Sequence, residues 1–330
     1  MRLIYAMLLG FILDLIFGDP HGLIHPVQII GWFIDKLKKG MQHMIYGCSY
    51  EEVREKEIER KTAGFFLMLF IVAGTFAVVY GILYVANLIH PVLRFCLETF
   101  FIYQILATKS LKTESMKVYK KLKEGDLIGA RKEVSYLVGR DTENLDESEV
   151  AKADVETIAE NTADGVIAPM LFIAIGGAPL GFAYKAVNTL DSMVAYKNEE
   201  LINIGFFSAK MDDICNFIPA RFAAVMLMIA SLILRFDFKG AVKIFKRDRF
   251  AHLSPNSAQT EAVAAGALQI QLGGTHNYFG KAVVKPTIGD DIRPVEYEDI
   301  KRTNQLLYVS AVLSMAVCCL ITFLIYVQLF

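Results

Sequence analysis

The stretch FFLMLFIVAGTFAVVYGILYVANLI, residues 65–89, decides the fold because it runs for 25 positions without a charged side chain. A second run of the same length, LLYVSAVLSMAVCCLITFLIYVQLF, occupies residues 306–330. A helix needs roughly 20 apolar residues to cross the hydrocarbon core of a bilayer, which is about 30 Å thick. Both stretches are therefore predicted to be membrane-spanning helices.

Four other apolar stretches are candidates for membrane helices. Residues 1–17 and 216–235 contain charged side chains, which can reach the interface from a helix end or face the interior of a bundle. Residues 91–108 carry two charges, and residues 166–184 contain two prolines and a pair of adjacent glycines. We predict an all-α, polytopic membrane bundle, built as a single domain from residues 1–330.

The composition agrees with a membrane class and argues against a nucleic-acid partner. Hydrophobic residues make up 54% of the 330, and the mean hydropathy of +0.40 is too high for an ordinary soluble protein. Lys and Arg number 34 against 35 Asp and Glu, so no excess of positive charge is available to bind nucleic-acid phosphates. The cysteines lack the spacing of a zinc site or a disulfide framework, and we predict that they are packing thiols. They are Cys48, Cys96, Cys215, Cys318 and Cys319.

Three polar stretches separate the apolar ones, at residues 18–62, 109–165 and 236–305. All three hold many Lys and Arg residues, and the positive-inside rule predicts that they share the cytoplasmic face of the inner cell membrane. An active site built from these stretches is therefore expected to face the cytoplasm.

The second polar stretch is predicted to form amphipathic helices that lie against the bundle. Residues 111–122 and 127–137 repeat apolar side chains at helical spacing on either side of a glycine turn. Asp146 and Asn256, each followed three positions later by Glu or Gln, fit capping boxes at helix starts. No run alternates in the way typical of a strand, so no sheet is expected.

Residues 166–184 are predicted to bend at GGAP, residues 176–179. Proline removes a backbone donor and disfavours helix at the residue before it, and each glycine costs a helix roughly 1 kcal/mol. A bend would bring the polar segments 156–164 and 188–191 to one site. A straight helix would instead hold them about 27 Å apart.

Carboxylates accumulate beside this interrupted segment. Glu156, Glu160 and Asp164 are spaced four apart, which places them on one helix face, and two further acidic clusters follow within residues 188–213. Carboxylate oxygens suit Mg²⁺, which proteins usually hold with one or two carboxylates and substrate phosphates. These residues could instead be solvated faces and helix caps, but their grouping favours a site. The predicted magnesium ligands are Glu160, Asp164, Asp191, Asp212 and Asp213.

The order of motifs along the chain is specific. ENTADGVIAP at residues 160–169 and YKAVNTLDSM at residues 184–193 are the most distinctive. With the other motifs, they make nearly the whole chain resemble the adenosylcobinamide-phosphate synthase family of cobalamin biosynthesis. The other motifs are LDL at 13–15, GDP at 18–20, HPV at 25–27, VGRDT at 138–142, DD at 212–213, PAR at 219–221, SPN at 254–256, EA at 261–262, LGG at 272–274 and NYFG at 277–280.

This resemblance implies an integral membrane enzyme that is a carbon–nitrogen ligase of the acid–amine type. Such an enzyme would join (R)-1-aminopropan-2-yl phosphate, or free aminopropanol, to adenosylcobyric acid and give adenosylcobinamide phosphate with consumption of ATP. The implied partners are the corrinoid substrate, the amino-alcohol phosphate, the lipid bilayer and other membrane-bound enzymes of cobalamin assembly. ATP and Mg²⁺ are the expected cofactors.

An amine does not condense with a carboxylate in water without activation, so we expect an acyl phosphate derived from ATP. His25 or a carboxylate would accept the proton of the amine, although a lone histidine is more often a structural donor. Arg140 and Asp141 could form a phosphate site or an internal ion pair. Asn277, Tyr278 and Phe279 could supply stacking and hydrogen bonds to the corrin. The predicted catalytic residues are Glu156, Glu160, Asp164, Asp191 and His25. The predicted substrate-binding residues are Arg140, Asp141, Asn161, Lys185, Asn188, Arg221, Asn256, Asn277 and Tyr278.

Two other classes of function remain open at this level. A small-molecule transporter would also place polar residues near a broken helix, but it should have corresponding interrupted helices in two halves, and the sequence has none. A non-catalytic membrane sensor or scaffold would not require so many acidic positions.

Overall fold

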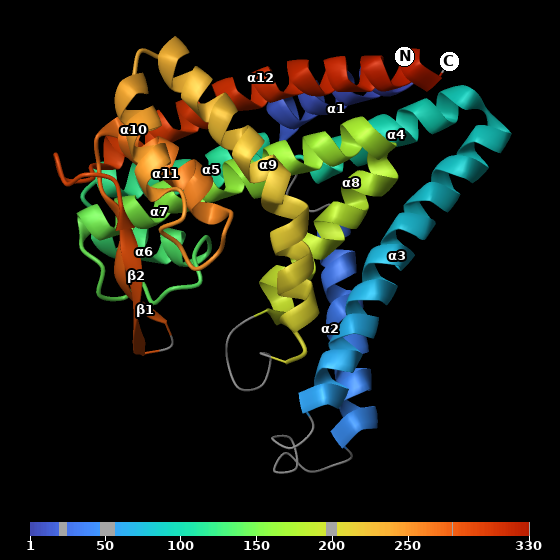
Figure 1. The fold of residues 1–330 in the computed structure, drawn as a ribbon, viewed down its shortest axis with the longest axis horizontal. Coiled ribbons are helices and arrows are strands. Elements are labelled where there is room, and N and C mark those ends of the chain that lie inside the picture. The colour runs from blue at the N-terminus through green and yellow to red at the C-terminus, as the bar shows by residue number, and fades with distance from the viewer. Residues whose placement is uncertain (20–24, 47–56, 196–202, 279, 330) are drawn as a thin grey trace.

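The computed structural model describes residues 1–19, 25–46, 57–195, 203–278 and 280–329. The fold is all-α apart from one small sheet, so the predicted fold class is confirmed (Figure 1). Within the described residues, four helical stretches are long and apolar enough to cross a membrane. They are Glu57–Ile89 (α3), Glu147–Val194 (α7, η2 and α8 in succession), Phe206–Ile233 (α9) and Tyr297–Gln328, which lies within α12 (Tyr297–Leu329).

Two predicted spans form shorter helices. α1 (Arg2–Phe17) has 16 residues and α4 (Pro91–Ile105) has 15. At 1.5 Å per residue these helices are about 24 and 23 Å long, less than the thickness of a bilayer core. Whether they cross the membrane stays a prediction.

The helix α3 presents the surface expected of a helix in lipid. Phe70, Tyr80, Leu88 and Ile89 are among its large side chains that are exposed. A contiguous apolar surface of this kind is rare on soluble proteins but matches a hydrocarbon environment. The prediction of a membrane helix at residues 65–89 agrees with this surface.

The chain bends sharply inside α8 (Ala168–Val194). Gly176 and Gly177 leave helical geometry, with φ values of −133° and 68°. The rings of Phe172 and Tyr184 stack with centroids 4.8 Å apart, although twelve residues of straight helix would separate them by about 18 Å. The predicted bend is confirmed. Only glycine adopts the positive φ of Gly177 readily, and a Cβ there would lie 2.7 Å from Oε1 of Glu98.

The polar helices follow the predicted pattern in residues 109–165. α5 (Thr108–Lys123) and α6 (Leu127–Ser135) bury Val118 and Val134 and form the expected helical pair. Asp146 makes the predicted capping box at the start of α7 (Glu147–Asn161). Asn256 precedes α11 (Ser257–Leu268) but makes no capping hydrogen bond, so that prediction is wrong. The remaining helices are α2 (Pro26–Tyr46), η2 (Thr162–Ile167) and α10 (Phe238–Asp248).

The prediction that the chain contains no sheet is also wrong. β1 (Leu272–Tyr278) and β2 (Lys281–Ile288) pair antiparallel in a hairpin. Gly273 and Gly274 have positive φ at an irregularity in the register, which hides any regular alternation in the sequence. Figure 1 shows the hairpin at one end of the molecule, and it packs against α7 and α11.

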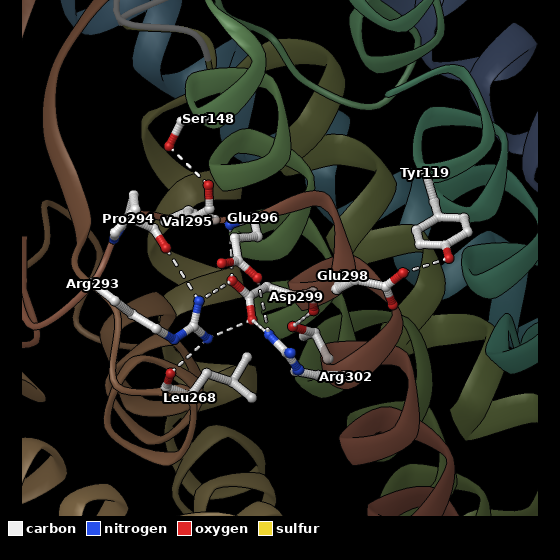
Figure 2. Close-up of polar contacts among 11 residues, drawn as sticks. Tyr119, Ser148, Leu268, Arg293, Pro294, Val295, Glu296, Glu298, Asp299 and Arg302 are labelled. Carbon is white, nitrogen blue, oxygen red and sulfur yellow. Dashed lines mark hydrogen bonds and ion pairs between the residues drawn. The ribbon is translucent and has the colours of Figure 1, made fainter. Parts of the chain in front are cut away.

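The segment before α12 fastens the polar helices together (Figure 2). Asp299 is fully buried and accepts hydrogen bonds from Arg293, at 2.6 and 2.8 Å, and from Arg302 at 2.7 Å. Arg293 also donates to the carbonyl of Leu268, the last residue of α11, at 2.8 Å. Two arginines therefore neutralise one buried carboxylate, and one of them fixes the end of α11 to α12.

Two further hydrogen bonds extend this connection to other helices. The Ser148 hydroxyl in the first turn of α7 donates to the carbonyl of Val295 at 2.9 Å. The Tyr119 hydroxyl of α5 donates to Glu298 at 2.8 Å. The helices α5, α7, α11 and α12 therefore share one polar junction, which holds α7 and α11 in place (Figure 2).

Candidate functional site

A polar pocket of about 170 Å³ lies where α7, α11, the loop before α7 and the β1–β2 hairpin meet. It is lined by both cations and carboxylates, which is unusual for a purely structural cavity. The titratable side chains that line it are Arg140, Glu156, Glu160, His252, Glu261, Tyr278 and Lys285.

Glu156 and Arg140 form the buried side of the pocket. The guanidinium of Arg140 is ion-paired with Glu156, and both side chains are more than 90% buried. Oε1 of Glu156 accepts a hydrogen bond of 2.7 Å from the backbone N–H of Gly273 in β1. Charge-assisted contacts of this kind fix geometry strongly in a low dielectric. Glu156 therefore connects the loop before α7 to the hairpin.

His276 of β1 completes this group. Its ring nitrogens lie 3.2 and 3.3 Å from Nη1 of Arg140. Burial, followed by the charge of Arg140, lowers the pKa of His276 from 6.5 to about 4. The imidazole is therefore neutral at pH 7 and accepts a hydrogen bond from the guanidinium.

Glu160 lies one helical turn beyond Glu156 and accepts a hydrogen bond of 2.7 Å from the hydroxyl of Ser257. Glu261, on the next turn of α11, is buried. Burial raises the pKa of Glu261 well above its usual range, and the charges of Glu160 and Glu156 raise it further. The pocket thus places a carboxyl group of raised pKa beside two further carboxyl groups.

His252 contributes a basic group that sequence analysis did not identify. Burial lowers the pKa of His252, so its imidazole is neutral at pH 7. Nδ1 accepts a hydrogen bond of 3.0 Å from the backbone N–H of Ser254, which leaves the other ring nitrogen for a proton. The charge of Glu160 acts on this histidine and stabilises its protonated form.

The hairpin brings Lys285 and Tyr278 to the pocket. Nζ of Lys285 donates to the Tyr278 hydroxyl at 2.9 Å. Asp141 holds the end of the hairpin, because its N–H donates to the carbonyl of Asn277 and its Oδ2 accepts from the N–H of Gly280, both at 2.8 Å. Asp141 thus contacts the hairpin, and its predicted contact with substrate stays a prediction.

A second polar group lies beyond Glu160, where the C-terminal end of α8 meets the N-terminal end of α9. Asp164, Asp191 and Asp212 are close enough to act electrostatically on one another, and Glu160 acts on the first two. Nδ2 of Asn216 donates to Oδ2 of Asp212 at 3.0 Å, while Oδ1 of Asp212 is buried without a hydrogen-bond partner among the described residues. The bend therefore joins the two acidic segments at one site, as predicted.

The negative charge of this second group suits a cation, but its side chains do not surround one completely. Like charges so close together repel unless a proton or a cation neutralises them, and the orphaned oxygen of Asp212 is suited to that role. Among the residues that the structure describes, no three His, Cys, Asp or Glu side chains are placed to hold a metal ion by themselves. Water and phosphate oxygens would have to complete the coordination.

A family model described as "CobD/Cbib protein" matches residues 7–307. The chain belongs to the CobD/CbiB family. No solved structure matches it.

Its CobD/CbiB relatives align over nearly their full length. The chain is 51% identical over 315 residues to "Cobalamin biosynthesis protein CobD" of Clostridium perfringens, covering 96% of each chain. It is 48% identical over 305 residues to the CobD protein of Streptococcus sanguinis, with 92% of this chain and 93% of the relative covered. Identity to "Cobalamin biosynthesis protein CbiB" of Salmonella choleraesuis is 43% over 314 residues, with 95% and 96% covered.

The predicted site residues of this CobD/CbiB chain fall into three places. The pocket takes in Arg140, Glu156, Glu160, Asn161 and Tyr278. The second polar group takes in Asp164, Lys185, Asn188, Asp191, Asp212 and Asp213, through electrostatic and hydrogen-bond contacts. His25 lies near that group, with Nε2 3.5 Å from Asp19, and its Nδ1 accepts from the N–H of Val27 at the start of α2.

The third place lies between α9 and the start of α11. Arg221 donates to Oδ1 of Asn256 at 2.8 Å, and Nδ2 of Asn256 donates to the carbonyl of Asp213 at 2.9 Å. These two predicted binding residues brace α9 against the start of α11. Asn277 contacts Asp141 through its backbone carbonyl, and Phe279 lies outside the described residues.

Sequence analysis missed four residues of this CobD/CbiB site, namely His252, Glu261, His276 and Lys285. Glu261 belongs to the EA motif at residues 261–262 and could have been suspected. The others are single titratable residues in polar sequence, and contacts over long separations bring them to the pocket. Gly273 and Glu156, for example, are 117 residues apart in the chain.

Proposed function

We propose that the protein is a membrane-embedded ligase of cobalamin biosynthesis. It joins (R)-1-aminopropan-2-yl phosphate, or aminopropanol, to adenosylcobyric acid through an amide bond and consumes ATP. Membership of the CobD/CbiB family and the names of its relatives support a role in cobalamin biosynthesis. The observation that carries the ligase proposal is the pocket in which cations, carboxylates and a neutral histidine meet.

The proposed chemistry has two steps. An oxygen of the corrinoid carboxylate attacks the γ-phosphorus of ATP, and ADP leaves. The amine then attacks the acyl carbon. The bond between this carbon and the oxygen that bridges to phosphorus breaks, and inorganic phosphate leaves. Arg140 and Lys285 would bind phosphate oxygens, because both lie at the pocket wall and carry positive charge.

The attacking amine must lose a proton. His252 is suited to accept it, since its imidazole is neutral at pH 7 and Glu160 stabilises the protonated form. We choose His252 over His25 because His25 does not line the pocket and its Nε2 lies 3.5 Å from Asp19.

Mg²⁺ would be held by Asp212 and one neighbouring carboxylate, Asp164 or Asp191, together with water and phosphate oxygens. Glu160 lies at the boundary between this group and the pocket. When bound, it would neutralise charge on phosphate oxygens. The bend of α8 would bring these carboxylates together beside Glu160, which lines the pocket. Asp213 is a weaker candidate, because Lys210 lies 3.7 Å from its carboxylate.

The substrates of the proposed reaction also indicate the side of the membrane to which the pocket opens. ATP and corrinoid precursors are cytoplasmic, so the pocket is proposed to open to the cytoplasmic side of the inner membrane. Nearby membrane-bound enzymes of cobalamin assembly are proposed as partners that pass on the corrinoid.

A direct assay tests the function. Purified full-length protein in detergent is incubated with adenosylcobyric acid, ATP, Mg²⁺ and each candidate amine, and products are identified by mass spectrometry. We expect ATP-dependent formation of the amide with one of the amines. A transporter, sensor or scaffold would form no amide under any of these conditions.

A further inference from the structure

Two arginines without a counter-ion meet where α9, the end of α10 and the start of α11 pack together (Figure 1). The charge of Arg249, the residue after α10, acts on Arg221 of α9. In the part of the chain that the structure describes, neither arginine forms an ion pair, and Arg221 donates to uncharged acceptors. These are the carbonyls of Phe217 and Pro255, at 2.8 and 3.3 Å, and Oδ1 of Asn256, at 2.8 Å.

Arg249 has fewer polar contacts than Arg221. Its Nε is buried and has no hydrogen-bond partner among the described residues. Its guanidinium carbon lies 5.3 Å from the ring centroid of Phe245 and 4.9 Å from that of Phe250. The guanidinium of Arg221 lies in the same way over the ring of Phe217, at 3.7 Å. Like charges that act on each other repel unless an anion neutralises them, and arginine binds phosphate through paired hydrogen bonds.

The surface beside these two arginines is apolar. Phe217 and Ile218 lie one turn before Arg221 on α9, and Ile218 is 73% exposed. Phe250, next to Arg249, is 64% exposed. The helix α9 is also long and apolar enough to cross a membrane. Unpaired guanidinium groups beside exposed apolar side chains match a ligand with an anionic head and a hydrocarbon tail.

We propose that Arg221 and Arg249 bind the phosphate of an anionic phospholipid. The phosphate accepts hydrogen bonds from both guanidinium groups, including Nε of Arg249, and an acyl chain lies on Phe217 and Ile218. A zwitterionic headgroup would bring a third cation to the two arginines, so an anionic headgroup such as phosphatidylglycerol is favoured. The site goes beyond the proposed function, because neither arginine lines the pocket.

Native mass spectrometry tests this site without depending on turnover. The full-length protein in detergent is titrated with phosphatidylglycerol, or with phosphatidylcholine of the same acyl chains, and the dissociation constant of the first bound lipid is measured. We expect the wild type to bind phosphatidylglycerol at least tenfold more tightly than phosphatidylcholine. Arg249→Gln should reduce this preference to twofold or less.

Two further variants distinguish a defined site from the general positive charge of α10. Lys239→Gln removes an exposed lysine from the first turn of α10 and should keep the tenfold preference. Arg249→Lys keeps the charge but loses the paired hydrogen bonds, so its preference should lie between those of the wild type and Arg249→Gln. Equal affinity of the wild type for the two lipids would overturn the proposal. An unchanged preference in Arg249→Gln would also overturn it, as would an equal loss in Lys239→Gln.

A competition titration distinguishes a lipid from a soluble anion. Ammonium phosphate or ATP is added at constant ionic strength to the wild type with phosphatidylglycerol bound. We expect neither to displace the lipid, because neither has a hydrocarbon tail to cover the exposed apolar side chains. Displacement by either one would assign the two arginines to a soluble phosphate compound, and the proposal would be wrong.

Discussion

At the scale of single residues, Glu160 is the side chain on which the account depends most. It lies between the pocket and the second acidic group and acts electrostatically on Asp164, Asp191 and His252. Glu160→Gln preserves the size and the hydrogen bond from Ser257 but removes the charge. We expect turnover to fall at least tenfold, about 1.4 kcal/mol of transition-state stabilisation, with partial recovery at raised Mg²⁺.

Steady-state kinetics over a range of Mg²⁺ concentrations measure this effect. Glu143→Gln, at an exposed position before α7, is the matched control and should behave as wild type. Unchanged turnover of Glu160→Gln at limiting Mg²⁺ would assign the acidic face to structure alone.

The lowered pKa of His276 predicts how the stability of the protein depends on pH. Its pKa is about 4 in the folded protein and 6.5 in the reference state, so the unfolded chain binds the proton first as pH falls. Stability is therefore full above pH 6.5 and decreases as pH falls toward about 4. His276→Gln should flatten this part of the curve of unfolding temperature against pH. An identical pH dependence in the variant and the wild type would contradict the placement of a neutral histidine beside Arg140.

At the scale of elements, the β1–β2 hairpin forms one wall of the pocket, and Asp141 holds its end. Asp141→Ala removes the acceptor for the N–H of Gly280 and should raise the KM for the amine at least fivefold, with a smaller effect on kcat. Asp141→Asn keeps an oxygen acceptor and should restore a KM close to wild type. Glu143→Ala is the control on the same loop. Equal defects in the Ala and Asn variants would instead indicate that the charge of Asp141 contacts substrate.

The elements differ in how far sequence predicts them. Residues 65–89 are predictable because a charge-free run of this length has few alternatives to a membrane helix. The bend at residues 176–179 is predictable because glycine and proline act locally. The hairpin is not, because its glycines and polar residues lack alternation, and its position depends on Glu156 and Asp141 far away in the chain. For the same reason His252, His276 and Lys285 could not be assigned to the site that Glu156 and Glu160 indicated.

At the scale of the whole molecule, the placement of the three polar stretches on one side of the membrane stays a prediction. Single cysteines at Lys39, Glu124 and Lys246, introduced into a chain without native cysteines, test it. We expect an impermeant maleimide to label all three in inverted vesicles and none in intact cells, because the Lys and Arg bias directs these stretches inward. Labelling of any of them in intact cells would overturn the arrangement.

The most direct test of the central claim, ATP-driven amide formation, follows an isotope. Adenosylcobyric acid with ¹⁸O in both oxygens of the reacting carboxylate is incubated with the protein, ATP, Mg²⁺ and the amine. Mass spectrometry then locates the label. An acyl phosphate predicts one ¹⁸O in the inorganic phosphate and one in the amide of the product. Amide formed with unlabelled phosphate, or label recovered in AMP, would contradict the account.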